Sequence, residues 1–411
     1  MTQFDIIVRP PVAGRWAGND SSDWHAGNNW SDFTVPTSIT DVVIPAGTPN
    51  TPVIYGATGQ AGTLCVEHGA TLSIDSPDTL YVQEDLTVRG HLALTVAGAK
   101  LQAGGDVRWE AGSTADMAGS STLELQGHML FANGANVSLN DGYVDFTGTS
   151  PSYIVTKSSG CNLHNLGNQK SGSDLVVSRL CLDAFHVNYF VNHSNATFRS
   201  ESYHPVVIDG WFNNLGGHIE CTDGSFVFSG ASGVVPLKPN AGDFFNDLVI
   251  DLSNTLTLED DYSTHLDVNG DLVIASGGLD AWNCTGISVG GTWSNAVGLT
   301  GFNPQGGTVT FDGLNTTQEV HGTTTFHNLA DTHSNGYLVL HDRADLHGDL
   351  VVGPGVQVHS DLGVSGELDL DSPTAFLEVH PGADVWAANL DMGGSLTSLG
   401  GVFSVDDIVD T

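Results

Sequence analysis

An internal repeat with a period of about 82 residues constrains the fold of this chain more than any other feature of its sequence. Three segments place a Phe two residues before a Gly, at Phe146, Phe228 and Phe311, and these positions differ by 82 and 83. An Asn-Leu or Asp-Leu pair follows each segment and ends at Leu166, Leu248 and Leu329, positions that differ by 82 and 81. A third marker consists of three tryptophans, each of which lies a similar number of residues before a Phe: Trp211, Trp293 and Trp386. A fixed period predicts a solenoid, propeller or array, in which each unit buries its apolar face only against its neighbours.

Apolar and polar residues alternate through most of the chain, for example at residues 70–74 and 121–125. Such alternation places one set of side chains inward and the other outward on a β-strand, and no helical apolar stripe is sustained. The spacing of Val268, Ile287 and Val309 indicates a coil of about 20 residues, so four coils fill each repeat. We therefore predict an all-β fold, a right-handed parallel β-helix. A propeller is disfavoured because no blade signature of about 40–50 residues recurs.

Composition changes near residue 60, where a Trp- and Pro-rich segment gives way to regular alternation. We expect residues 1–60 to form an N-terminal strand and a Trp-rich cap, and residues 61–411 to form the β-solenoid with its repeat. The open end of a solenoid exposes unpaired main-chain groups, and three large rings suit a plug over it: Trp16, Trp24 and Trp30. The alternative role for these rings is an aromatic platform for carbohydrate. The strand expected at residues 4–8 either folds back on its own chain or adds to a neighbour's open edge.

The chain is strongly acidic, with 11 Lys and Arg against 47 Asp and Glu and a formal net charge of −36. Nucleic acid is not an expected partner, because phosphate binding needs a cationic surface. Membrane insertion is not expected either, since no segment reaches the apolar length of a transmembrane span. We expect self-association into a polymer that strengthens with salt, calcium or mild acid, because these screen or neutralise the repulsion between acidic faces.

Two interpretations remain open for the acidic residues. They form either a solvated surface or specific Ca²⁺ sites, which are built from oxygen ligands on Asp-rich turns. The candidate calcium ligands lie in three short clusters: Asp75, Asp78, Glu259, Asp260, Asp261, Asp369 and Asp371. None of these clusters has EF-hand spacing, and no cofactor other than Ca²⁺ is expected.

The cysteines form an odd set without a C-x-x-C pair: Cys65, Cys161, Cys181, Cys221 and Cys284. The lack of paired spacing disfavours a structural zinc site. The cysteines are either buried free thiols that pack as small apolar side chains, or they include one disulfide formed in an oxidising compartment. The N-terminus lacks the basic and long apolar regions of a secretory signal.

The N-terminal segment resembles the opening of large bacterial cell-surface proteins. Its W-x-G, W and N-W elements and the strand-like motifs after them read GRWAG at 14–18, DW at 23–24, NNW at 28–30, VPT at 35–37 and DVVIP at 41–45. These motifs are similar to those of the secreted Gly- and Asn-rich β-solenoid adhesins of gliding and biofilm-forming Bacteroidota. The resemblance implies stacked strands and a surface or extracellular structural role, with no catalytic residues. The chain departs from that family in lacking a recognisable C-terminal sorting domain and in placing Thr40 before Asp41.

An enzyme is the competing class, because parallel β-helices include polysaccharide lyases and hydrolases that use paired carboxylates and a basic residue. Carboxylates are too frequent here to indicate a site, and the arginines lack partners identifiable by spacing: Arg108, Arg179, Arg199 and Arg343. The histidines lie mostly in strand or turn contexts and are interpreted as satisfied or solvated, among them His164, His327, His347 and His359.

We therefore predict a non-enzymatic structural protein that is secreted or held at the bacterial surface. Its form is either a self-assembling filament or sheath subunit or an adhesin stalk, and surface glycans are potential partners. The alternatives are a carbohydrate-binding or polysaccharide-degrading β-helix protein and a phage fibre module.

Overall fold

A computed structural model of the chain describes residues 12–157, 162–230, 235–259, 265–282, 284–314, 317–333, 335–370 and 372–409, apart from the side chains of residues 235, 236 and 409. The chain divides into two compact units, Met1–Phe185 and His186–Thr411. In each unit, parallel β-strands stack in successive coils, which confirms the predicted all-β solenoid. A single 3₁₀-helix, η1 (Gly27–Asn29), is the only helix in the described ranges.

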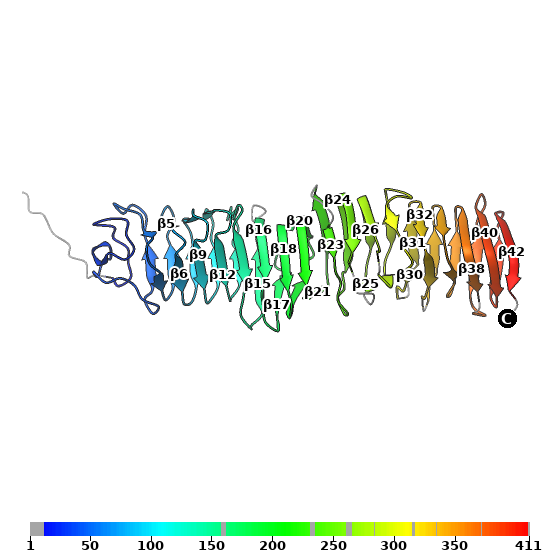
Figure 1. Cartoon of the computed structure of the whole chain (residues 1–411), viewed down its shortest axis with the longest axis horizontal. Helices are drawn as coiled ribbons and strands as arrows, with labels where there is room; N and C mark the ends of the chain where they lie inside the picture. Colours follow the sequence, from blue (N-terminus) through cyan, green and yellow to red (C-terminus); the bar gives the residue numbers. More distant parts are fainter. Residues whose placement is uncertain are drawn as a thin grey trace, which may run out of the picture. The chain divides into compact units, whose positions relative to one another are not determined.

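Strands of successive coils stack side by side along the first unit (Figure 1). They belong to three parallel sheets. The first sheet contains β1 (Val42–Ile44), β4 (Leu64–Val66), β7 (Leu86–Val88), β10 (Val107–Trp109), β13 (Met129–Phe131), β15 (Ser152–Thr156) and β17 (Ser173–Val177). The second contains β2 (Val53–Ile54), β5 (Thr71–Ile74), β8 (His91–Leu94) and β11 (Thr114–Met117). The third contains β3 (Gly59–Ala61), β6 (Thr79–Val82), β9 (Lys100–Ala103), β12 (Thr122–Leu125), β14 (Tyr143–Phe146) and β16 (Asn162–Asn168). Neighbouring strands of a sheet belong to successive coils.

The register between neighbouring strands gives the length of a coil. Val42 pairs with Leu64 and Leu64 with Leu86, so one coil takes 22 residues at this position. The coils average about 22 residues, slightly more than the 20 that the sequence predicts. The parallel ladder begins at Val42, inside the range 1–60 that was expected to hold only the strand and the cap.

Alternation explains why the coils pack. In β5, Leu72 and Ile74 are fully buried while Thr71 and Ser73 remain partly exposed. The same inward row continues in β8 through Leu92. Because each strand buries only alternate residues, the interior fills with stacked aliphatic rows and the outward rows stay free to carry polar groups.

The second unit has two long parallel ladders. One contains β18 (Phe185–His193), β20 (Val206–Leu215), β22 (Ser225–Gly230), β24 (Asp247–Leu258), β26 (Leu272–Asp280), β28 (Trp293–Asn295), β31 (Gln318–His321), β34 (Leu338–Leu340), β37 (Val356–Val358), β39 (Phe376–Val379) and β41 (Ser395–Ser398). The other contains β25 (His265–Val268), β27 (Gly286–Val289), β30 (Thr308–Phe311), β33 (Asn328–Asp331), β36 (Leu350–Val351), β38 (Leu362–Leu370), β40 (Asp384–Met392) and β42 (Val402–Val409). Shorter strands add to these ladders or pair beside them: β19 (Ala196–Ser200), β21 (His218–Cys221), β23 (Val235–Leu237), β29 (Phe302–Asn303), β32 (Thr324–Phe326) and β35 (Ala344–Leu346).

The predicted equivalence of the repeat markers is wrong within the second unit. Phe228 and Phe311 are both fully buried, but Phe228 lies in the ladder of β22, β24 and β26, whereas Phe311 lies in that of β27, β30 and β33. The coil length explains the failure. Four coils in the ladder of β22 carry the chain from Phe226, two residues before Phe228, to Val320, which lies well beyond Phe311. A constant spacing in sequence therefore does not return the chain to the same sheet.

The three tryptophan markers are not equivalent either, since their environments differ. Trp293 is fully buried in β28, whereas Trp386 is 38% exposed on β40. Trp211 is partly exposed on β20 and stacks against Tyr189, with ring centroids 4.5 Å apart.

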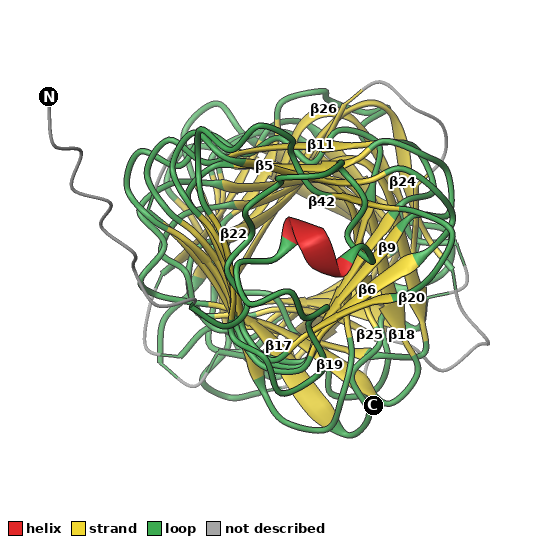
Figure 2. Ribbon diagram, turned by 90° about the vertical axis from the view of Figure 1, so that its left-hand side faces the viewer, coloured by secondary structure: helices red, strands yellow, loops and turns green. Residues whose placement is uncertain are grey.

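The Trp-rich segment covers the first coil of the first unit, as predicted. Trp16, Trp24 and Trp30 are at most 1% exposed, and Trp30 meets each of the other two rings edge to face. The main chain pairs with the first coil as well, since the amide of Trp16 donates to the carbonyl of Val43. Figure 2, which looks onto this side of the chain, shows η1 lying across the coil. Because the rings are buried, the alternative of a carbohydrate platform built from them is wrong.

Gly14 allows the cap to approach the first coil closely. Its φ is +69°, in the left-handed region, and an added Cβ would lie 2.0 Å from the carbonyl oxygen of Asp41. Only glycine combines this backbone angle with such close contact.

Four cysteines form no disulfide: Cys65, Cys181, Cys221 and Cys284. Burial raises the pKa of the Cys221 thiol, so it stays protonated and packs as a small apolar group. Cys161 lies outside the described residues, as does the strand expected at residues 4–8.

Candidate functional site

A row of four histidines crosses four consecutive coils of the second unit. β31, β34, β37 and β39 pair in parallel, with Val320, Leu340, Val358 and Val379 in register. One residue further along each strand stands a histidine: His321, His341, His359 and His380. We call these four residues the histidine row.

The inward neighbours fix the direction of the row. Val320 and Val379 are at most 1% exposed, so the residues on either side of them point outward. Main-chain hydrogen bonds continue through the row, because the amide of His341 donates to the carbonyl of Val320 and that of His359 donates to that of Leu340. The side chains are therefore held at neighbouring strand positions on a rigid ladder.

The imidazoles form two stacked pairs. The ring centroids of His321 and His341 are 4.4 Å apart with planes 4° from parallel, and those of His359 and His380 are 3.8 Å apart at 19°. A looser contact of 5.4 Å at 45° joins His341 to His359.

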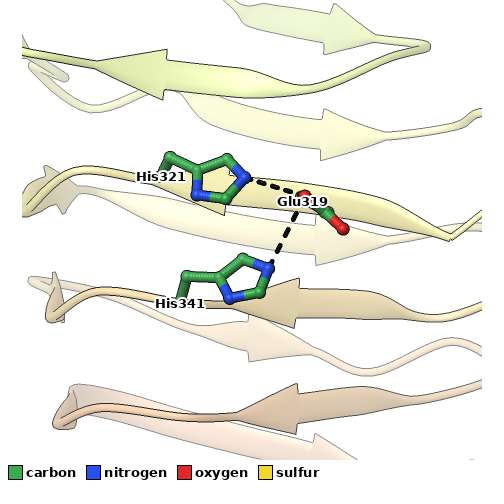
Figure 3. A group of neighbouring side chains, drawn as sticks. All are labelled: Glu319, His321 and His341. Carbon is green, nitrogen blue, oxygen red and sulfur yellow. Dashed lines mark hydrogen bonds and ion pairs between the residues drawn. The ribbon is translucent and has the colours of Figure 1, made fainter.

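A glutamate accompanies each outer histidine of the row, two residues earlier on the same face. Glu319 Oε2 lies 2.8 Å from His321 Nε2 and 3.6 Å from His341 Nε2, so one carboxylate serves two coils (Figure 3). Glu378 Oε1 lies 2.8 Å from His380 Nε2 at the other end of the row. The tripeptide Glu-Val-His therefore occurs at both ends.

The electrostatics favour the ionised form of Glu319 and the neutral form of His359. The hydrogen bond from His321, with the nearby His341, lowers the pKa of Glu319 below its usual value. Partial burial lowers the pKa of His359, and the neighbouring His380 and His341 act in the same direction. The Nε2 atoms of His341 and His380 are shielded from solvent yet make no well-aligned hydrogen bond.

The potential ligand atoms of Glu319, His321 and His341 lie close together. One ligand atom from each lies within 4.8 Å of the other two, which makes this the only group of its kind in the part of the chain that the structure describes. Two imidazoles and a carboxylate suit Zn²⁺ and related transition metals, whereas Ca²⁺ prefers oxygen ligands alone.

The sequence prediction missed this group although a signal for it was present. The positions of successive histidines in the row differ by 20, 18 and 21, close to one coil each. His359 was interpreted singly as a satisfied or solvated side chain, because the variable coil length hides the alignment from a search for one fixed period.

Two of the predicted calcium ligands accept hydrogen bonds from neighbouring hydroxyl groups. Asp75 accepts a hydrogen bond of 2.6 Å from the hydroxyl of Thr95, and Asp78 accepts one from Ser76. Glu259 is exposed at the end of β24. Asp260, Asp261 and Asp371 lie outside the described residues.

Asp369 has acidic neighbours on other coils. It pairs across the ladder with Asp391, and burial together with Asp391, Asp369 and Asp349 raises the pKa of the adjacent Glu367. The acidic groups thus meet between coils as well as along β38. Asp371, the predicted partner of Asp369, lies outside the described residues.

A second feature is a groove of about 310 Å³ on the outer face of the first unit. It crosses β10, β13 and β15, and two cations, Arg108 and Lys157, line it together with Glu110, Leu130 and Asn133. Arg108, for which spacing revealed no partner, thus shares a concave surface with a second cation.

Comparison with known proteins adds one match. Residues 15–115 are similar to a family model described as a domain of unknown function (DUF8693). The match spans the Trp-rich cap and the coils up to β11, so the similarity includes both the cap and the first coils of the solenoid. No curated protein and no solved structure matches the chain. The described residues include no helix with the length and apolar character to cross a membrane.

Proposed function

We propose that the protein is a non-enzymatic structural β-solenoid that acts outside the cell or at the bacterial surface. The observation that carries the proposal is the unbroken stacking of coils over an apolar interior in each unit, with short strands and polar outward rows. Each coil is held by main-chain ladders and by the rows above and below it, which suits a stiff spacer or a polymer subunit.

The arginines support a structural role. Arg199 on β19 forms an ion pair of 2.6 Å with Glu220 on the neighbouring strand β21, and Arg343 pairs with Asp345 at 3.0 Å. Each of these cations thus neutralises one carboxylate of the coil surface. The net charge of −36 keeps such a surface soluble and makes the contact between subunits dependent on ionic strength.

Immunogold electron microscopy of intact and permeabilised cells tests the proposal. We expect label on the outside of intact cells, on regular filaments for a polymer subunit or on isolated projections for an adhesin stalk. Label confined to permeabilised cells would overturn the proposed location. Purified protein that gave only globular particles at every salt concentration would overturn the structural role.

A second candidate function is recognition of an anionic glycan by the groove of the first unit. In a chain with 11 Lys and Arg, Arg108 and Lys157 converge on one concave surface, which suits a carboxylate-bearing sugar. Calorimetric titration with polygalacturonate fragments tests this. Binding that is lost in Arg108→Ala and Lys157→Ala, and kept in a variant of the exposed Arg89, would support it.

A further inference from the structure

We infer that Glu319, His321 and His341 bind one divalent transition-metal ion of the zinc type, which bridges two coils of the second unit. This site goes beyond the proposed structural role. It rests on the positions of three side chains and on the chemistry of their ligand atoms.

The backbone holds the ligands before any metal arrives. Glu319 and His321 stand on β31, His341 follows β34 directly, and the register of these strands is fixed by Gln318 opposite Leu338 and Val320 opposite Leu340. Strands in a ladder are about 4.8 Å apart, so two side chains at paired positions already face one ion. Little conformational freedom remains to be lost when the ion binds.

The distances between the three ligand atoms become those of a zinc site after small side-chain rotations. Glu319 Oε2 lies 2.8 Å from His321 Nε2 and 3.6 Å from His341 Nε2. Ligand atoms bound tetrahedrally at about 2.0–2.1 Å from zinc are roughly 3.3 Å apart. The three side chains are between 34% and 43% exposed, so rotation does not disturb the buried valine and leucine rows beneath them.

One ligand atom makes only a long contact without the ion. His341 Nε2 is shielded from solvent, makes no well-aligned hydrogen bond and lies 3.6 Å from Glu319 Oε2. A shielded nitrogen without a good hydrogen bond is unfavourable, and coordination to a cation removes that penalty. The acidic surface adds a long-range attraction for divalent cations.

A neighbouring histidine pair shows what distinguishes the site. The register of β32 and β35 sets Phe326 opposite Leu346, so His327 and His347 follow on adjacent coils. Asp345 stands two residues before His347, but Arg343 already binds its carboxylate at 3.0 and 3.1 Å. Glu319 Oε2 instead lies 2.8 Å from His321 Nε2 and 3.6 Å from His341 Nε2, so its carboxylate is directed at the same point as the two ring nitrogens.

Isothermal titration of the full-length, untagged, chelator-treated protein with zinc chloride tests the inference. We expect a saturable site with one Zn²⁺ per chain, and no comparable binding of Ca²⁺ or Mg²⁺. His341→Ala and Glu319→Gln should each weaken zinc binding by at least about tenfold, which is the loss typical even of residues that only support ligands. His347→Ala is the matched control and should bind zinc as the unaltered protein does.

Co²⁺ provides a second readout, because bound nitrogen and oxygen ligands give it visible absorption bands. These bands should appear with one equivalent and vanish in His341→Ala, while circular dichroism shows that the variant retains its β-structure. Absence of saturable zinc binding would overturn the inference. Equal losses in His347→Ala and His341→Ala would also overturn it, since the metal would then bind exposed histidines without preference.

Discussion

The first and the last described coils each have a neighbouring coil on one side only, and they differ in how their apolar side chains are covered. At the start, Trp16, Trp24 and Trp30 are at most 1% exposed and cover the first coil. At the other end, β42 pairs with β40 alone among the described strands, and Val402 and Ile408 are 60% and 65% exposed. One coil is sealed by large rings, and the other leaves apolar side chains in contact with solvent.

The difference shows where stabilising free energy is concentrated. Burial of a large aromatic ring contributes several times more than an aliphatic side chain that stays mostly exposed. The cap also satisfies polar groups, since the indole of Trp30 donates to the carbonyl of Trp24 and that of Trp16 to the carbonyl of Asn50. We therefore expect substitutions in the cap to affect stability far more than substitutions in the last coil.

The largest effect is expected for Trp30→Ala. The ring is fully buried between two other indoles, so its removal leaves a cavity and should lower the free energy of unfolding of the first unit by about 3–5 kcal/mol. Denaturant unfolding followed by circular dichroism measures the loss. Trp386→Ala removes a ring that is 38% exposed on β40 and serves as control. Losses of equal size would show that the cap does not seal the coil.

The features that the sequence predicts correctly are those that depend on local physics. Alternation in segments such as residues 71–74 predicts a strand and its buried face, because the side-chain period of a strand is fixed by its covalent geometry. Burial of the three tryptophans followed from their size and from the exposed end of a solenoid. Neither prediction needed the length of a coil.

The position of a residue along the solenoid cannot be predicted in the same way, because it depends on the lengths of several turns together. Trp293 pairs with Val320, whereas Leu338 pairs with Val356, so the first of these coils is half as long again as the second. Such variation carried Phe311 into a different ladder from Phe228 and hid the alignment of the histidine row. Contacts between coils therefore emerged only from the strand register.

An intermediate effect is expected from a charge buried within the capped unit. Lys170 is 1% exposed, and its ammonium donates to the carbonyls of Gln126 and Thr147 at 2.9 and 2.6 Å. Burial lowers the pKa of Lys170 from 10.5 to about 8. Between these pH values the unfolded chain holds a proton that the folded chain has released, so the free energy of unfolding should rise with pH.

Lys170→Met isolates this contribution. The stability of the unaltered protein relative to the variant should increase by roughly 2–3 kcal/mol between pH 8 and 10.5, and should be constant below that window. Denaturant titrations of both proteins across this range measure the difference. A difference that did not change with pH would mean that Lys170 remains protonated in the folded chain. Unlike the loss expected for Trp30→Ala, this effect appears only in alkaline solution.

The smallest effect is expected for Val402→Ser in the last coil. The valine is 60% exposed, so folding removes little of its surface from water, and exposed positions of this kind usually change stability by less than about 0.5 kcal/mol. Leu390→Ser, at a position 3% exposed on the neighbouring strand β40, is the matched buried control and should cost several times more. The two losses are compared by measuring the free energy of unfolding of the second unit in each variant. A large loss in Val402→Ser would show that a further contact covers β42 in solution, and dilution would then reduce that loss, because contact between separate chains weakens as their concentration falls.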